Sequence, residues 1–163
     1  MTNNLFDYAL SQELQEFEGD YVPDLPSSFF KCQTFKTLKL GRIDSLKKTL
    51  LSKSLEFASL KTLKLVNVCI SDKNIHLSGD QSLFSNCLNS ENIELQYCNL
   101  VSPFKTFIIN LPGLVNLIIL NLRCNVDMFE ISTPRLKSFE LTSDGFYYGS
   151  PSGRIENGEL SNS

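Results

Sequence analysis

Apolar and polar residues follow a short pattern that recurs along the chain. Residues 35–40 read Phe-Lys-Thr-Leu-Lys-Leu, and residues 60–65 read Leu-Lys-Thr-Leu-Lys-Leu. The last three residues of each copy alternate apolar, polar and apolar, which is typical of a short strand with one buried face. Another apolar residue lies three positions before that strand. The pattern therefore predicts a strand that needs neighbouring units to cover its apolar face.

Weaker copies of this pattern extend over most of the chain. Intervals of 21, 25, 30, 27 and 19 residues separate the ends of successive copies. This spacing and the form L-x-x-L-x-L are typical of leucine-rich repeats, which stack because no single unit can bury its own apolar face. We predict an α/β leucine-rich-repeat solenoid over residues 8–143, with five to six irregular repeats. A curved parallel sheet would carry short helices or loops on its convex side. The copies end at Gly19, Leu40, Leu65, Leu95, Leu122 and Leu141.

The segments between the strands contain two helix signals. Ser102-Pro103 is a favourable helix start, apolar residues follow at helical spacing, and Pro112-Gly113 would end the helix. Asp80 would cap a second short helix that ends near Leu88. After residue 143 the sequence becomes rich in Gly, Ser and Asn, so residues 144–163 are expected to form a flexible C-terminal tail.

The repeats also resemble those of a known family. Residues 25–40, 59–68 and 83–89 are similar to the repeat region of plant F-box proteins with leucine-rich repeats, the FBD-containing group. The phrase Cys-x-x-Phe-Lys-Thr-Leu-Lys-Leu carries much of the resemblance, which covers residues 8–143. The resemblance implies a repeat region that binds the substrate of an SCF-type ubiquitin ligase. In that family an F-box docks the Skp-family adaptor.

The resemblance is limited to the repeat region and includes neither the F-box nor the FBD segment. The residues before the first repeat are too few for a three-helix F-box, and those after Leu141 do not resemble an FBD segment. We therefore expect a protein-binding fragment or truncated form whose target is unknown. It would join a Skp-family adaptor only if an F-box is supplied elsewhere.

Other functions remain open from the sequence. The repeats could be the leucine-rich sensor region of an intracellular immune receptor, which would need a nucleotide-binding module upstream. They could also be a non-functional remnant, because neither end shows a polar capping repeat. An enzyme is disfavoured, since His76 is the only histidine and no nucleophile motif or Gly-rich phosphate loop is present. We predict no catalytic residue, no cofactor and no metal.

Composition restricts the partners and the compartment. The 163 residues are 42% hydrophobic with a net charge of −3, which predicts one globular domain and argues against nucleic-acid binding. Residues 106–122 carry no charge, but Asn residues and Pro-Gly interrupt them, so we expect no membrane span. Five cysteines without a C-x-x-C pair suggest neither a disulfide framework nor a zinc site. An intracellular location, cytoplasmic or nuclear, is the expectation.

Charge is unevenly distributed along the repeats. Residues 1–30 carry six acidic and no basic side chains, whereas residues 31–64 carry nine basic and two acidic ones. The middle residue of each strand should face the concave side, with Lys39 and Lys64 forming a basic stripe at one end and acidic residues following at the other. This would be a graded protein-binding surface, or simply a face charged for solubility. A nucleic-acid partner is disfavoured because no aromatic side chain accompanies the lysines.

Period-two alternation selects the candidate binding residues. They are the side chains that flank the strand leucines and should project from the concave face. Cys98 and Cys124 lie just after strands, where we expect small buried side chains in a turn. The predicted protein-binding residues are Thr37, Lys39, Thr62, Lys64, Asn92, Glu94, Gln96, Asn121, Arg123, Ser138 and Glu140.

Overall fold

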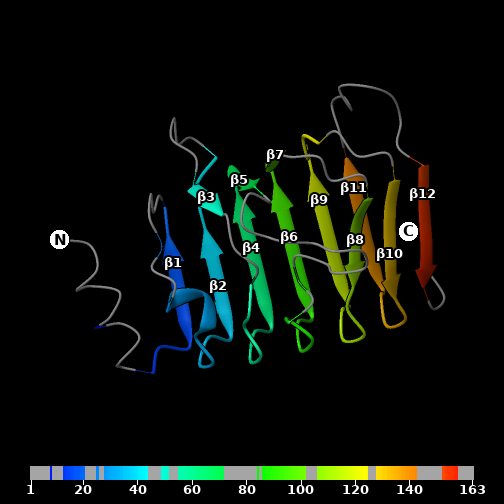
Figure 1. The fold of residues 1–163 in the computed structure, drawn as a ribbon. Helices are drawn as coiled ribbons and strands as arrows, with labels where there is room; N and C mark the ends of the chain where they lie inside the picture. Colours follow the sequence, from blue (N-terminus) through cyan, green and yellow to red (C-terminus); the bar gives the residue numbers. More distant parts are fainter. Residues whose placement is uncertain are drawn as a thin grey trace.

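Short parallel strands dominate the structure, which is a computed structural model. Six strands lie side by side in one large sheet, and two smaller sheets line other sides of the stack (Figure 1). Every strand pair recorded within these sheets is parallel. The structure describes residues 8, 13–20, 25, 28–43, 49–51, 55–71, 84, 86–101, 106–124, 128–142 and 152–157.

The six-stranded sheet is built from the sequence repeats, with the order β1-β2-β4-β6-β9-β11. Even the weakest copy contributes, because Gly19 pairs with Leu40. The predicted solenoid with a parallel sheet is thus confirmed. The strands are β1 (Glu16–Gly19), β2 (Thr37–Leu40), β4 (Thr62–Val66), β6 (Asn92–Gln96), β9 (Asn116–Leu120) and β11 (Ser138–Thr142).

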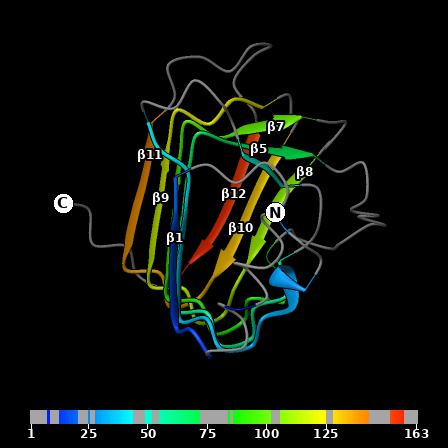
Figure 2. The same cartoon turned by 90° about the vertical axis from the view of Figure 1, so that its left-hand side faces the viewer.

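Strands also form on other sides of the solenoid, as the view along the stack shows (Figure 2). One small sheet has the order β3-β5-β7 and the other has the order β12-β10-β8. A 3₁₀ helix, η1 (Phe29–Lys31), follows β1. These strands are β3 (Thr49–Leu51), β5 (Val68–Ser71), β7 (Asn99–Val101), β8 (Thr106–Asn110), β10 (Met128–Thr133) and β12 (Ser152–Asn157).

The helix predicted to begin at Ser102-Pro103 is wrong, because the described part of that segment is strand β8. Phe107 and Ile109 are buried while their neighbours are more exposed, so burial alternates with period two. β-Branched residues favour this strand, and β10 pairs with it from Thr106 to Asn110. Pro112-Gly113 does not end a helix but occupies the middle of a turn before β9.

Two other sequence predictions concern the C-terminal residues and the segment after Asp80. Strand β12 lies within the expected tail and pairs with β10. The remaining residues of 144–163 and the short helix expected after Asp80 lie outside the described residues, as does His76. The domain boundary at residue 143 therefore stays a prediction.

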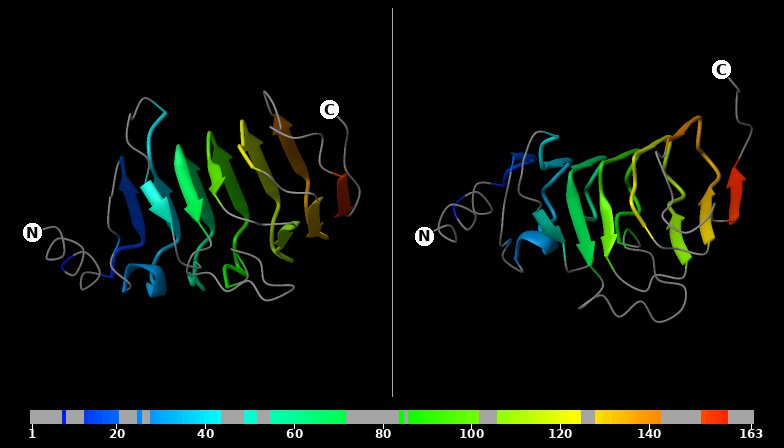
Figure 3. Two further views of the ribbon diagram at one scale, coloured as in Figure 1. Left: turned by 45° about the horizontal axis from the view of Figure 1, so that its top comes forward. Right: turned by 90° about the horizontal axis from the view of Figure 1, so that it is seen from above.

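The strands of the six-stranded sheet lie side by side (Figure 3), and backbone hydrogen bonds before each strand align the repeats. The carbonyl oxygen of Lys36, directly before β2, accepts hydrogen bonds from the N–H groups of Lys61 and Thr62 at 2.8 and 3.0 Å. The residue before each following strand repeats this arrangement. Because main-chain atoms set this alignment, the intervals between repeats can vary without loss of register. The accepting residues are Gln15, Lys36, Lys61, Glu91 and Val115.

Rows of apolar side chains run beneath the six-stranded sheet. In one row Leu40, Leu65, Leu95 and Ile119 are stacked in register, and each is at most 1% exposed. Aromatic rings fill two other regions: Phe29 contacts four neighbouring rings near β1, and Phe107 contacts the rings of Phe84 and Phe129. The continuous rows show why an isolated repeat would not be stable.

The fourth copy was assigned to the wrong register in the sequence. Ile119, not Leu122, stacks on Leu95, and Leu141 stacks on Ile119. Four consecutive apolar residues, 117–120, let two registers satisfy the same pattern. Leu122 is buried beyond the end of β9 instead. Cys98 and Cys124 are both buried after their strands, as predicted.

Cys87 is buried in the core below β6. Its thiol donates a weak hydrogen bond to the carbonyl oxygen of Leu55 at 3.5 Å. Burial raises the pKa of the Cys87 thiol from 9.0 to about 11. The folded protein therefore keeps a proton that the unfolded chain releases as the pH rises past about 9.

We expect this difference to destabilise the folded protein at alkaline pH. The free energy of unfolding should fall between about pH 9 and pH 11, by roughly 2 to 3 kcal/mol from Cys87. Urea titrations of the wild type and of Cys87→Ala across this range measure the effect. The variant should show a shallower decline, and identical slopes would contradict the assigned burial of the thiol.

Candidate functional site

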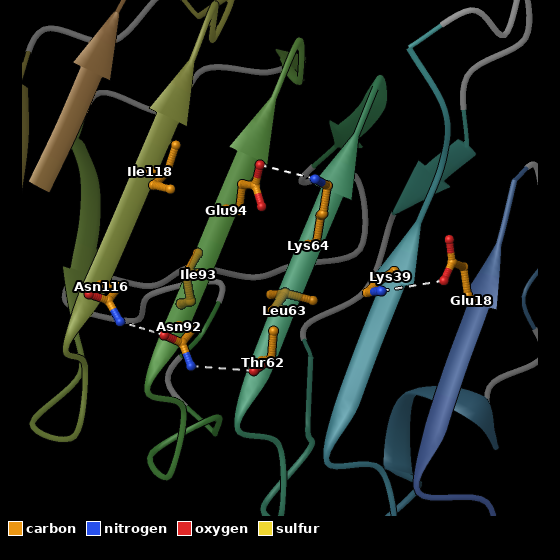
Figure 4. A pocket seen from close by; sticks show the side chains of 10 residues that line it. All are labelled: Glu18, Lys39, Thr62, Leu63, Lys64, Asn92, Ile93, Glu94, Asn116 and Ile118. Carbon is orange, nitrogen blue, oxygen red and sulfur yellow. Dashed lines mark hydrogen bonds and ion pairs between the residues drawn. The ribbon is translucent and has the colours of Figure 1, made fainter. Parts of the chain in front are cut away.

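The side chains that alternate with the buried rows form the outer face of the six-stranded sheet (Figure 4). Two rows of in-register residues cross this face from strand to strand. The first row consists of Glu18, Lys39, Lys64, Glu94, Ile118 and Glu140. The second row consists of Glu16, Thr37, Thr62, Asn92, Asn116 and Ser138.

Most of the predicted binding residues lie on this outer face, but Asn121 and Arg123 do not. Asn121 has a φ of 52° in the turn after β9, and Arg123 forms a bridge with Asn99 at the sheet of β7. The register error in the fourth copy explains both misplacements. The structure places these predicted residues on the outer face: Thr37, Lys39, Thr62, Lys64, Asn92, Glu94, Gln96, Ser138 and Glu140.

Asn116 and Ile118 belong to the outer face and were missed in the sequence. A turn signal could have found them. The N–H of Leu114 donates to the carbonyl oxygen of Leu111, and the same turn precedes β4, β6 and β11. Pro112 and Gly113 are typical of the middle of such a turn. Counting from that turn places Leu117 and Ile119 in the buried rows.

Ion pairs connect neighbouring strands on the outer face. The Nζ atom of Lys39 lies 3.4 Å from Oε2 of Glu18, and that of Lys64 lies 3.1 Å from Oε1 of Glu94. The first row thus begins with the order acidic, basic, basic and acidic. The expected basic stripe at one end of the sheet is wrong, because the two lysines lie between carboxylates on both flanks.

A further ion pair lies at the lower rim of β4 and β6. Lys61 Nζ is 2.8 Å from Glu91 Oε1, and this hydrogen bond lowers the pKa of Glu91 below its usual 4.5. Exposed pairs of this kind contribute little to stability individually. Lys61–Glu91 and Lys64–Glu94 join the same two repeats, with the basic side chains in the β4 repeat and the acidic ones in the β6 repeat.

Amide side chains of the second row form a hydrogen-bonded chain. Asn116 Nδ2 donates to Asn92 Oδ1 at 2.6 Å, and Asn92 Nδ2 donates to Thr62 Oγ1 at 3.4 Å. Gln96 donates in addition to the carboxylate of Glu94. The polar groups are thus held in fixed positions, while each amide keeps further donor or acceptor capacity.

A groove of about 530 Å³ crosses the outer face from β1 to β9. Its lining combines two lysines, two carboxylates, a row of hydrogen-bonding groups, two isoleucines and a leucine. Such a mixture suits recognition of a ligand rather than bond-making chemistry. The lining residues are Glu18, Lys39, Thr62, Leu63, Lys64, Asn92, Ile93, Glu94, Asn116 and Ile118.

The described part of the chain shows neither a metal centre nor a membrane-spanning helix. Its His, Cys, Asp and Glu side chains form no group of three or more that could hold a metal ion. Its helical segments include none that is long and apolar enough to cross a membrane. The outer face therefore remains the candidate site within the described residues.

The stacked parallel strands and leucine rows define a leucine-rich-repeat solenoid. A family model described as FBD-associated F-box protein At5g56370, LRR repeats, matches residues 7–155. The chain belongs to this leucine-rich-repeat family of FBD-associated F-box proteins. No curated protein and no solved structure matches the chain.

Proposed function

We propose that the outer face of the six-stranded sheet binds a protein, and that the chain is the substrate-recognition region of an F-box protein. Leucine-rich repeats are in general non-enzymatic interaction modules, which supports the first part. Membership of the F-box-associated family supports the second part. The observation that carries the proposal is the groove across the outer face, with its charged and amide lining.

The extent of the groove favours a protein over a small ligand. Its lining comes from five strands, β1, β2, β4, β6 and β9, so it offers contacts along much of the sheet. Ion pairs and amides occupy the surface, and such polar groups give specificity to protein interfaces.

Site-specific photo-crosslinking tests the binding face. A benzophenone amino acid is introduced at Thr62 or Asn116 on the outer face, and at Ile108 or Glu130 on the sheet of β8 and β10 as controls. In an extract of the source organism, the outer-face positions should give a discrete protein adduct that the controls lack. Equal labelling from both sheets would contradict the proposed face.

The ligase role needs a separate experiment. We expect a Skp-family adaptor to co-purify with the chain only when an F-box is joined to it. The protein captured by crosslinking should co-purify with both forms, because it would bind the repeats. Adaptor capture by the chain alone would contradict this division of roles.

A further inference from the structure

The groove contains two lysines that lie side by side. Lys39 and Lys64 are in-register partners on β2 and β4. Their ammonium groups turn in opposite directions, toward Glu18 and Glu94 respectively (Figure 4). Among the described residues, no ion pair fills the space between the two lysines. Like charges directly opposite each other on neighbouring strands are unfavourable, so an anionic group between them would be stabilised.

The existing ion pairs do not prevent such a group from binding. Each ammonium carries three N–H donors, and within the described part of the chain one carboxylate accepts from it. Lys39 keeps 45% of its side-chain surface exposed and Lys64 keeps 35%. Because exposed ion pairs are weak, a ligand carboxylate can contact both lysines at little cost.

The opposite end of the groove has a different character. Ile118 occupies the first-row position next to Glu94, where the other first-row residues are charged. Glu94 lies between Ile118 and Lys64, and the amides of Asn92 and Asn116 lie beside them in the second row (Figure 4). The groove thus offers a pair of lysines flanked by carboxylates, a row of amides and an apolar end.

These features specify the chemistry of the partner. We propose that the partner inserts an extended segment into the groove, running across the strands. This inference rests on the proposed function. One Asp or Glu side chain lies between Lys39 and Lys64, and one apolar side chain four residues away packs on Ile118. The amides of Asn92 and Asn116 hydrogen-bond to the segment's main chain.

Strand spacing sets the separation of four residues. Parallel strands lie about 4.8 Å apart, so Ile118 on β9 is about 12 Å from the midpoint between β2 and β4. An extended chain advances about 3.3 Å per residue, and only residues an even number apart face the same side. A separation of four residues spans about 13 Å and fits this distance.

The flanking carboxylates restrict the segment to one acidic residue. Glu18 and Glu94 lie on either side of the lysines, and Glu140 lies beyond Ile118. A second acidic side chain in the segment would meet one of these groups. Like-charge contacts exclude wrong partners in this way, so a run of acidic residues should bind worse than a single one.

NMR titrations with short peptides test this specificity. The probe Thr-Glu-Thr-Ser-Thr-Leu-Thr carries Glu and Leu four residues apart in residues that favour extended chains. At millimolar concentration it should shift the amide signals of β2, β4, β6 and β9. An isomer with Glu and Leu adjacent, and a version with Glu at every Thr, should each bind about tenfold more weakly. No shift with the first probe would overturn the proposal.

Charge variants provide the second arm of the test. Lys39→Glu/Lys64→Glu should weaken binding of the first peptide by about tenfold or more. Glu18→Gln/Glu94→Gln should tighten it severalfold, because the lysines are released from their partners. Lys36→Glu/Lys137→Glu makes the same change in net charge outside the groove and serves as the control.

The outcomes separate this inference from the proposed function. If the groove variants and the control variant weaken the peptide equally, the assigned lysine pair is wrong. If photo-crosslinking still captures a protein from the outer face, the binding function stands and only the partner's chemistry is refuted. If crosslinking fails while the peptide binds as described, the proposed cellular role is refuted instead.

Discussion

Leu95→Ala should lower the free energy of unfolding by about 3 to 4 kcal/mol. Leu95 is fully buried and lies in the middle of its row, with Leu65 and Ile119 stacked on either side. Truncation removes apolar contacts and leaves a cavity that regular neighbouring strands cannot easily close. Urea denaturation followed by circular dichroism measures the loss.

Leu141→Ala is the matched control, because Leu141 occupies the same row at the edge strand β11. Its side chain is 43% exposed, so removal should cost less than about 1 kcal/mol. A similar loss from both variants would show that position in the row does not determine burial. The stacked-row description of the core would then be wrong.

Gly41→Ala should destabilise the protein by at least about 3 kcal/mol. Gly41 follows β2 with a φ of +88°, a conformation that residues with a side chain adopt at a cost of about 1 to 2 kcal/mol. An added Cβ atom would also lie 1.8 Å from the carbonyl oxygen of Val66. Because this neighbour is backbone, relief requires the strands themselves to move. Thermal unfolding by calorimetry measures the effect.

Gly113→Ala provides the comparison for this substitution. Its added Cβ atom would lie 3.1 Å from the carbonyl oxygen of Leu88, which a small displacement can relieve. We expect a much smaller decrease in stability than for Gly41→Ala. If the two alanine variants unfold at the same temperature, the close approach of Gly41 to the neighbouring repeat is not present in solution.

The parallel sheet could be predicted because its signal is repeated. The matching phrases in residues 35–40 and 60–65 align β2 with β4, and the resulting register extends to β1, β6 and β11. Period-two alternation then identified the outer-face residues on these strands. Each of these inferences depends on a local pattern that is compatible with only one structure.

Prediction failed where a local pattern is compatible with two different structures. Residues 117–120 are all apolar, so either register buries leucines, and the preceding turn decides between them. Phe107, Ile108 and Leu111 fit a helical period, whereas Phe107 and Ile109 fit a strand period, and pairing with β10 decides for the strand. Both decisions are made by contacts outside the segment itself.

The arrangement of charges also depends on neighbouring repeats. The order of Glu18, Lys39 and Lys64 could be read from the sequence, but the direction in which each lysine turns could not. Lys39 turns toward β1 and Lys64 toward β6, which opens the space between them. The chemistry inferred for the partner therefore required the structure.

Disulfide formation between introduced cysteines tests the central claim, that one ladder of repeats continues through the fourth copy. Glu94 and Ile118 are in-register partners, so their Cα atoms should be about 4.8 Å apart, within the range of a disulfide. Asn121 is three residues further along the chain from Ile118 and too far from Glu94. We predict that oxidised Glu94→Cys/Ile118→Cys yields this crosslink by peptide mapping, and that Glu94→Cys/Asn121→Cys does not. The reverse result would contradict the ladder.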